Sequence, residues 1–160
     1  MKRPKKENMV KGVLNRVLQL LARFGPGAAS LRVTLNRMRG ARIGKDAWIG
    51  YDCIFDTSSP FLIEIGDNVS ISMRVTLIAH FKESEGIKIE DDAFVGPGAI
   101  ILPNVTIGKG AVVTAGSVVA KSVPAGAMVQ GNPATAILRC ETPLSEEVSL
   151  KSFTQGLRAA

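Results

Sequence analysis

The chain has 160 residues, of which 46% are hydrophobic, and a net charge of +6, a composition typical of one globular domain with its own core. No apolar stretch is long enough to cross a bilayer, and Lys11, Arg16 and Arg23 interrupt the only segment similar to a signal peptide, so the sequence predicts neither feature. The two cysteines, Cys53 and Cys140, have neither metal-binding nor disulfide spacing, which favours a reducing, cytoplasmic compartment.

Most of the positive charge lies near the N-terminus, where residues 1–42 carry eleven Lys or Arg and one acid. An amphipathic helix is expected in this segment, ending at Gly25-Pro26-Gly27. Its apolar face consists of Val10, Leu14, Val17, Leu18, Leu21 and Phe24. A second, short helix is expected before Gly40, with Leu31, Leu35 and Met38 on one face. Residues 1–40 are therefore predicted to form a basic helical arm.

Two roles fit this arm. The helices can pack on the first coil of the repeat that follows and shield its open end, as terminal caps do in stacked repeats, and this role is favoured. Alternatively, residues 1–27 can lie as a basic amphipathic element on the inner face of an anionic membrane. No nucleic-acid partner is expected, because the aromatic side chains that stack on bases make up only 5% of the chain.

From residue 41 onward the dominant feature is an aliphatic residue at every sixth position, a period that belongs to neither a helix nor a simple strand. The positions are Ile43, Ile49 and Phe55, then Ile65, Ile71 and Leu77, then Ile89, Val95, Ile101, Ile107, Val113 and Val119, with the register continuing to Ala125. The fourth position of most hexads is Gly, Asn or Asp, the residues that enter left-handed turns at low cost. Three such hexads can close one coil, and coils stack about 4.8 Å apart. A parallel β-helix is therefore expected over residues 41–139.

The period is interrupted twice. The step from Phe55 to Ile65 is ten residues, and the break falls at Asp56-Thr57-Ser58-Ser59-Pro60. Between Leu77 and Ile89 the phase survives, but residues 80–86 offer no aliphatic side chain for the core and are expected to leave the coil. Loops on a rigid scaffold often carry function, so the site is expected beside these interruptions.

The only histidine of the chain, His80, stands at the start of the second interruption. A neutral imidazole titrates in the range that a general base requires, and acyl transfer to a hydroxyl group needs such a base. One histidine is too few for a γ-class carbonic anhydrase, which uses the same type of fold but binds each zinc ion through three. No metal site is therefore expected.

The hexads end before Cys140, and residues 140–160 are predicted to form a tail that is largely helical. The segment Thr142-Pro143-Leu144-Ser145-Glu146-Glu147 has the composition of a capped helix start. Val148, Leu150, Phe153 and Leu157 would give the helix an apolar surface that packs on the last coil.

Several segments together resemble the hexapeptide-repeat acyltransferases, over residues 41–139. They are Ile65-Gly66-Asp67-Asn68-Val69, Val75-Thr76-Leu77, Phe94-Val95-Gly96, Asn104-Val105-Thr106-Ile107-Gly108, Ala115-Gly116-Ser117-Val118-Val119 and Gly131-Asn132-Pro133-Ala134. Within that family, the pattern is most similar to the sugar O-acetyltransferases of the galactoside, maltose and nodulation-factor type and of surface-polysaccharide gene clusters. The resemblance implies a left-handed parallel β-helix, a homotrimer, and acetyl-CoA bound between neighbouring subunits.

The resemblance also assigns residues on the acceptor side. His80 matches the catalytic histidine of the family, and Asp56 falls where these enzymes place an acceptor-binding Asn. The Asp56 carboxylate could accept hydrogen bonds from sugar hydroxyls, orient the imidazole, or simply cap a turn. Arg74 could contact an anionic acceptor, although a solvated charge at a corner is the simpler interpretation.

On the cofactor side, the resemblance places Pro97 and Ala115 where small residues contact the pantetheine arm of acetyl-CoA, and Lys121 at the nucleotide-binding position. Relatives often have Lys or Arg where this chain has Thr135, so Arg139 is the candidate for the 3′-phosphate, with a solvated charge as the alternative.

The hypothesis for function is an acetyl-CoA-dependent O-acetyltransferase that modifies a hydroxyl of a sugar, a polysaccharide precursor or a lipid-linked saccharide. The alternatives are a non-catalytic β-helix that serves as a scaffold or oligomerisation module, and an N-acyltransferase of an amino sugar. A serine acetyltransferase is disfavoured, because its large helical N-terminal domain has no room in 40 residues.

Overall fold

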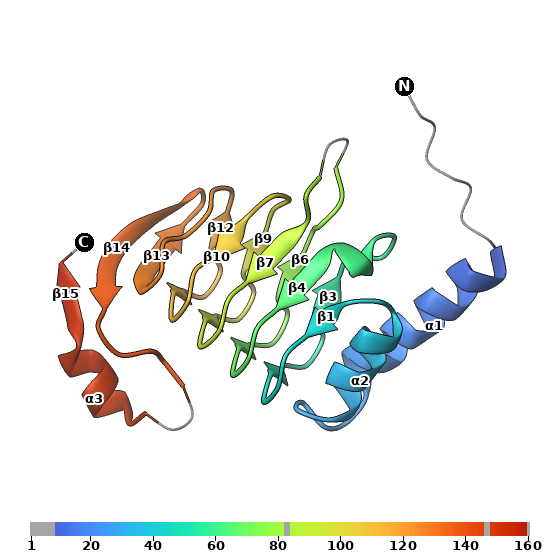
Figure 1. Cartoon of the computed structure of the whole chain (residues 1–160), viewed down its shortest axis with the longest axis horizontal. Helices are drawn as coiled ribbons and strands as arrows, with labels where there is room; N and C mark the ends of the chain where they lie inside the picture. The colour runs from blue at the N-terminus through green and yellow to red at the C-terminus, as the bar shows by residue number, and fades with distance from the viewer. Residues whose placement is uncertain (1–8, 82–83, 146–147, 160) are drawn as a thin grey trace.

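The structure is a computed structural model that describes residues 9–81, 84–145 and 148–159. Its central part is a prism with three walls, each a parallel sheet of very short strands stacked along the long axis (Figure 1). Sheet A contains β1 (Arg42–Ile43), β4 (Ile63–Ile65), β7 (Ile87–Ile89) and β10 (Thr106–Ile107). Sheet B contains β2 (Trp48–Ile49), β5 (Ser70–Ile71), β8 (Phe94–Val95) and β11 (Val112–Val113). Sheet C contains β3 (Ile54–Phe55), β6 (Thr76–Leu77), β9 (Ile100–Ile101) and β12 (Val118–Val119).

The core consists of the aliphatic ladders that the hexads predict. In sheet C, for example, Phe55 pairs with Leu77, Leu77 with Ile101, and Ile101 with Val119, and none of these side chains is more than 1% exposed. Successive side chains of a strand point to opposite faces, so one residue of each two-residue strand fills the axis of the prism. The predicted parallel β-helix of hexapeptide repeats is confirmed.

The fourth position of the hexads adopts the left-handed conformation, with φ between 52° and 70°. These residues are Asp46, Asp52, Asn68, Arg74, Asp92, Gly98, Asn104, Gly110 and Gly116. Arg74 is the exception by residue type, because the other eight are Gly, Asn or Asp, for which this conformation costs less.

The sequence register fails at the last coil. Val123, not Ala125, pairs with Ile107, and Val129 pairs with Val113, so the final coil is two residues shorter than three hexads. Val123 is 4% exposed, whereas Ala125 is exposed. The larger apolar side chain takes the core position, and the expectation for Ala125 is wrong.

Two helices lie at the N-terminal end of the prism, α1 (Met9–Phe24) and α2 (Leu31–Met38) (Figure 1). Helix α2 buries Val33 and Leu35. Helix α1 buries only Gly12, Gln19 and Ala22. No helix among the described residues is both long and apolar enough to cross a membrane.

At the other end, β13 (Ala127–Gly131) continues sheet B and turns back as the antiparallel strand β14 (Ala134–Cys140). The tail is only partly helical: α3 (Leu150–Gln155) is followed by β15 (Leu157–Ala159), which pairs with β14. The helix begins after Ser149, whose side chain accepts a hydrogen bond from the Ser152 N–H, and not at the predicted start, of which Glu146 and Glu147 lie outside the described residues. Phe153 packs against Val112 and Met128 of sheet B, so the tail does lie on the last coils.

Candidate functional site

Both interruptions of the period lie at one corner of the prism, where the chain passes from sheet C to sheet A. The first consists of residues 56–59 followed by the short 3-10 helix η1 (Pro60–Leu62). The second runs from the end of β6 to Ile87, and its residues 82 and 83 lie outside the described residues. The Asp56 N–H donates to the Leu77 carbonyl at 2.9 Å, so the two loops start from neighbouring coils. Residues far apart in the sequence therefore meet at this corner.

Asp56 and His80 form a hydrogen-bonded pair at the corner. The His80 Nδ1 atom lies 2.5 Å from Asp56 Oδ2, which also accepts the backbone N–H groups of Ala79 and His80 at 2.9 Å. The other carboxylate oxygen, Oδ1, accepts the N–H groups of Ser58 and Ser59 at 2.9 Å. The Asp56 side chain is 1% exposed and the His80 side chain 57% exposed. A buried carboxylate thus holds an imidazole that faces solvent.

The hydrogen bonds keep Asp56 ionised. Burial by itself raises the pKa of the Asp56 carboxyl, but the hydrogen bonds from His80 and from the backbone N–H groups of Ser59, His80 and Ser58 outweigh it and lower the pKa below the usual value. Because an ionised carboxylate only accepts hydrogen bonds, the neutral imidazole carries its proton on Nδ1. The Nε2 atom then has a free lone pair, which is the state that a general base requires.

Three roles are possible for Asp56 from the sequence, and the geometry favours two of them together. The contacts of Oδ1 are those of a turn cap, and the contacts of Oδ2 orient the histidine. With five hydrogen bonds accepted and 1% of the side chain exposed, the carboxylate offers little surface to an acceptor hydroxyl. Direct acceptor contact by Asp56 therefore gains no support from the geometry.

The residues that support the Asp56 loop from behind come from the N-terminal helices, and no motif in the sequence indicates this role. Arg39, at the end of α2, donates from Nη2 to the carbonyls of Phe55 and Asp56 at 3.1 and 2.9 Å. Burial lowers the pKa of Arg39 to about 10 although the nearby charge of Asp56 opposes the shift, so the guanidinium remains charged at neutral pH. From α1, Asn15 donates to the Thr57 carbonyl at 2.6 Å. The pair is thus anchored to both N-terminal helices.

The candidate cofactor residues lie around sheet C. Pro97 and Ala115 are exposed and occupy the same corner on successive coils, where the Gly116 N–H donates to the Pro97 carbonyl at 2.9 Å. This corner is at the opposite edge of sheet C from His80. Lys121 is exposed. Because it follows β12, it lies at the edge of sheet C that also carries the Asp56 and His80 loops.

The remaining two candidates differ in their position relative to this group. Arg74 is exposed in the turn between sheets B and C, beside the turn of Tyr51, whose carbonyl accepts the Arg74 N–H at 2.9 Å. On the coil above, the Gly98 N–H donates to the Met73 carbonyl at 3.0 Å, so the turn of Arg74 lies directly below that of Pro97. Arg139 is exposed on β14, where it pairs with Ala127 of β13 and Arg158 of β15. The single chain therefore brings Asp56 together with His80 and stacks the turns of Arg74, Pro97 and Ala115 at one corner, whereas Arg139 lies on β14, outside both groups.

Comparisons with known proteins identify relatives of this chain. The family described as "Bacterial transferase hexapeptide (six repeats)" matches residues 86–121. The Bacillus subtilis (strain 168) protein YvoF, which is named as an acetyltransferase, is 32% identical over 130 residues, which cover 78% of this chain and 75% of YvoF. A 2,3,4,5-tetrahydropyridine-2,6-dicarboxylate N-acetyltransferase of Staphylococcus aureus (strain JH9) is 42% identical over 74 residues, 45% of this chain and 31% of that protein.

Solved structures agree with the fold. A maltose O-acetyltransferase from Clostridium difficile 630 superposes with a TM-score of 0.56 at 26% identity, covering 86% of this chain and 88% of that one. The Neisseria gonorrhoeae serine acetyltransferase has a TM-score of 0.55 at 28% identity, covering 78% of this chain and 51% of that one. This chain therefore spans about half the length of the serine acetyltransferase that it matches.

Proposed function

Because the chain belongs to the family of hexapeptide-repeat acetyltransferases, we propose that it transfers the acetyl group of acetyl-CoA to a hydroxyl group of a saccharide, with His80 as the general base. The observation that carries the proposal is the pair in which the buried Asp56 carboxylate holds Nδ1 of an exposed imidazole. This arrangement leaves Nε2 as a base on the outside of the prism, where an acceptor can reach it.

In the proposed reaction, His80 Nε2 removes the proton of the acceptor hydroxyl as its oxygen attacks the thioester carbonyl. The new ester C–O bond forms, the C–S bond breaks, and the thiolate of CoA leaves with the proton that His80 returns. The positive charge that develops on the imidazole lies next to the ionised Asp56, which stabilises it. No covalent enzyme intermediate is required.

For the donor substrate, we assign Pro97 and Ala115 to the pantetheine arm, because both are exposed and stacked, and Ala115 has a small side chain that lets an amide-bearing chain approach the backbone closely. Lys121 supplies a cation for the phosphates at the edge of sheet C that also carries His80. Arg139 is the proposed contact of the 3′-phosphate, in place of the cation missing at Thr135.

For the acceptor, we propose a sugar, a polysaccharide precursor or a lipid-linked saccharide, and we place Arg74 on an anionic group of it. The similarity to a maltose O-acetyltransferase structure along most of both chains supports a hydroxyl acceptor. The 42% identity to an N-acetyltransferase covers only 45% of this chain, which makes transfer to an amine the second candidate.

We also propose a homotrimer, the usual assembly of this family, with subunits in contact through sheet C. The outward residues of sheet A are mainly polar or charged: Arg42, Glu64, Lys88 and Thr106. The outer face of sheet B is covered by the tail through Phe94 and Val112. The outward residues of sheet C are mainly apolar and half-buried: Ile54, Thr76, Ile100 and Val118. An apolar surface is the one suited to a stable subunit interface. Sheet C also lies between the two groups of site residues, with Asp56 and His80 at one edge and Pro97 and Ala115 at the other.

The test is thiol release from acetyl-CoA across a panel of sugars, amino sugars and nucleotide-linked or lipid-linked saccharides, with mass spectrometry of the product. We expect His80→Ala to lower kcat/KM by about 10²- to 10⁴-fold while the fold persists. Lys88→Ala, on the outer face of sheet A and not one of the candidate site residues, is the matched control and should keep full activity.

Full activity of His80→Ala with an accepted sugar would show that the base is wrong. N-acetylated product would favour the second candidate. If no acceptor stimulates thiol release and calorimetry detects no binding of acetyl-CoA, the chain is a scaffold and not an enzyme.

A further inference from the structure

Helix α1 shows its apolar side to solvent. Eight large apolar side chains of this helix are between 48% and 81% exposed: Met9, Val10, Val13, Leu14, Val17, Leu20, Leu21 and Phe24. At 100° per residue they fall within an arc of about 140°, so they form one continuous stripe along the helix. An exposed apolar stripe of this extent on a folded domain marks a contact surface for another protein or a membrane.

The opposite side of the helix is what fixes this orientation. Gln19 donates to the Phe55 carbonyl at 3.4 Å and to Thr57 Oγ1 at 3.3 Å, and Arg23 forms an ion pair with Asp52 at 2.6 Å. Together with the Asn15 contact, these bonds attach the polar side of α1 to the first coil. A rotation that buried the stripe would break all of them, so the stripe remains outward in the isolated chain.

The charge around the stripe identifies its occupant. Lys11, Arg16 and Arg23 are the charged residues of α1, and the helix has no acid. On the helical wheel, Lys11 and Arg16 lie at the two edges of the apolar arc, where long cationic side chains reach the headgroups of a bilayer. A second copy of the chain would bring a stripe bordered by the same positive charge. An anionic bilayer is the complementary surface.

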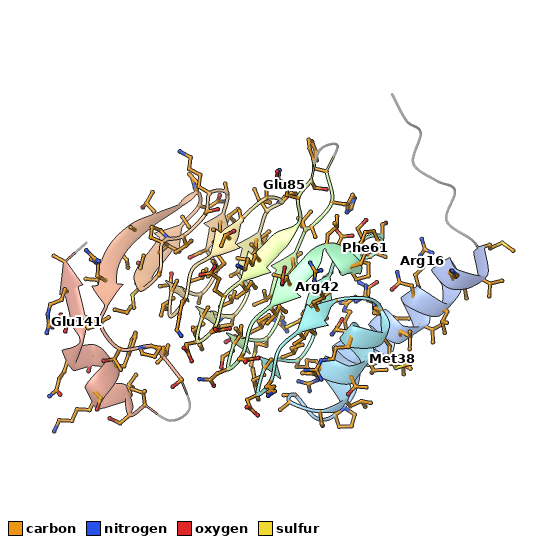
Figure 2. All side chains as sticks on the ribbon, viewed as in Figure 1. Arg16, Met38, Arg42, Phe61, Glu85 and Glu141 are labelled. Atoms are coloured by element: carbon orange, nitrogen blue, oxygen red, sulfur yellow. The ribbon has the colours of Figure 1, made fainter. Side chains whose placement is uncertain are left out.

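The apolar surface extends beyond the helix. A groove of about 370 Å³ between α1 and the corner is lined by Leu14, Leu18, Met38 and Phe61, among others. Met38 and Phe61 are 65% and 59% exposed, and both lie on the α1 side of the prism in Figure 2. The groove also touches Ser58, whose N–H binds Asp56. A membrane or protein in contact with the stripe would therefore lie next to residues 56–59, the loop whose Asp56 binds His80.

We propose that the apolar stripe of α1 docks the protein on the surface of an anionic lipid bilayer, as a peripheral contact. The inference does not depend on the acetyl transfer, because the contacts that carry it are those of α1. If the proposed function holds as well, docking places the Asp56 and His80 pair close to acceptors that are anchored in the same membrane.

The test is flotation of the full chain with vesicles of phosphatidylcholine alone and of phosphatidylcholine mixed with phosphatidylglycerol. We expect the protein to float with the anionic vesicles only, and the double variant Val17→Gln with Leu21→Gln to lose at least about tenfold in partitioning. Glutamine favours helix and adds no charge. The matched control is Ile137→Gln with Leu150→Gln, which replaces two exposed apolar side chains at the other end of the prism and should float like the wild type.

The proposal is wrong if the wild type stays below the anionic vesicles, or if the Val17 and Leu21 variant floats as well as the control. Analytical ultracentrifugation without lipid gives an independent check, in which wild type and variant should have the same mass. A smaller assembly for the variant alone would show that a second copy of the chain, and not lipid, covers the stripe.

Discussion

The corner between sheets C and A differs from the other two corners of the prism. At the corners from A to B and from B to C, the chain turns within one hexad, through a left-handed residue such as Asp46 or Gly98. At the corner from C to A, two of the coils instead leave the prism as loops, and these loops carry Asp56 and His80.

The difference shows how a regular scaffold gains a site. A turn within one hexad commits its polar groups to the neighbouring coil: Asp67 Oδ1 accepts the Lys45 N–H at 2.7 Å, and Asp91 Oδ1 accepts the Asp67 N–H at 2.9 Å. A longer loop frees backbone N–H groups, and four of them converge on the Asp56 carboxylate. The regular corners hold successive coils together, and the irregular corner carries the pair that we propose as the catalytic site.

The largest difference in activity between the irregular corner and a regular corner should come from an Asp to Asn substitution at each. In Asp56→Asn the amide would donate to His80 Nδ1, which moves the imidazole proton to Nε2 and removes the base. We expect kcat/KM to fall by about 10²- to 10⁴-fold. Asp52→Asn, at a regular corner, loses its ion pair with Arg23 but should retain activity. Equal losses of kcat/KM in the two variants, measured by thiol release, would contradict the distinction between the irregular corner and the regular ones.

The regular walls should show the opposite response. Ile71 is fully buried in sheet B, between Ile49 and Val95. Ile71→Ala should lower the free energy of unfolding by about 2–5 kcal/mol through the lost burial and the cavity that remains. Urea denaturation measures this loss, and activity per folded molecule should not change. A variant that keeps its stability but loses activity would mean that the wall takes part in the chemistry.

The smallest effect concerns Arg74, whose φ of 58° is unfavourable for its residue type. Asn tolerates this conformation, so Arg74→Asn should raise the free energy of unfolding by about 0.5–1 kcal/mol. If Arg74 also binds an anionic acceptor, the KM for that acceptor should rise in the same variant. A loss of stability in thermal denaturation would show that Arg74 makes a structural contact that outweighs the strain.

Much of the prism could be predicted from the sequence, because a strict period places each aliphatic residue in a ladder without knowledge of distant contacts. The two interruptions were visible for the same reason. The period could not show that the Asp56 carboxylate is buried beneath His80, because that depends on loop conformation and on Arg39 and Asn15 from the N-terminal arm.

Three further features depend on packing, strand pairing or polar contacts that the six-residue period does not encode. The final coil shortens because Val123 fills the core better than Ala125. The strand β15 has no hexad pattern, and it forms because β14 offers it an edge. For α1, the helical wheel identified the apolar side, but only the polar contacts of Gln19 and Arg23 determine that this side faces outward.

The central claim is that Asp56 acts through His80, and a double-mutant cycle tests it most directly. The measurement is kcat/KM for thiol release by the wild type, His80→Ala, Asp56→Asn and the double variant. If the carboxylate serves only to hold the imidazole, the double variant should be no slower than His80→Ala alone. If the two losses multiply, Asp56 acts independently of His80, and the account of the pair is wrong.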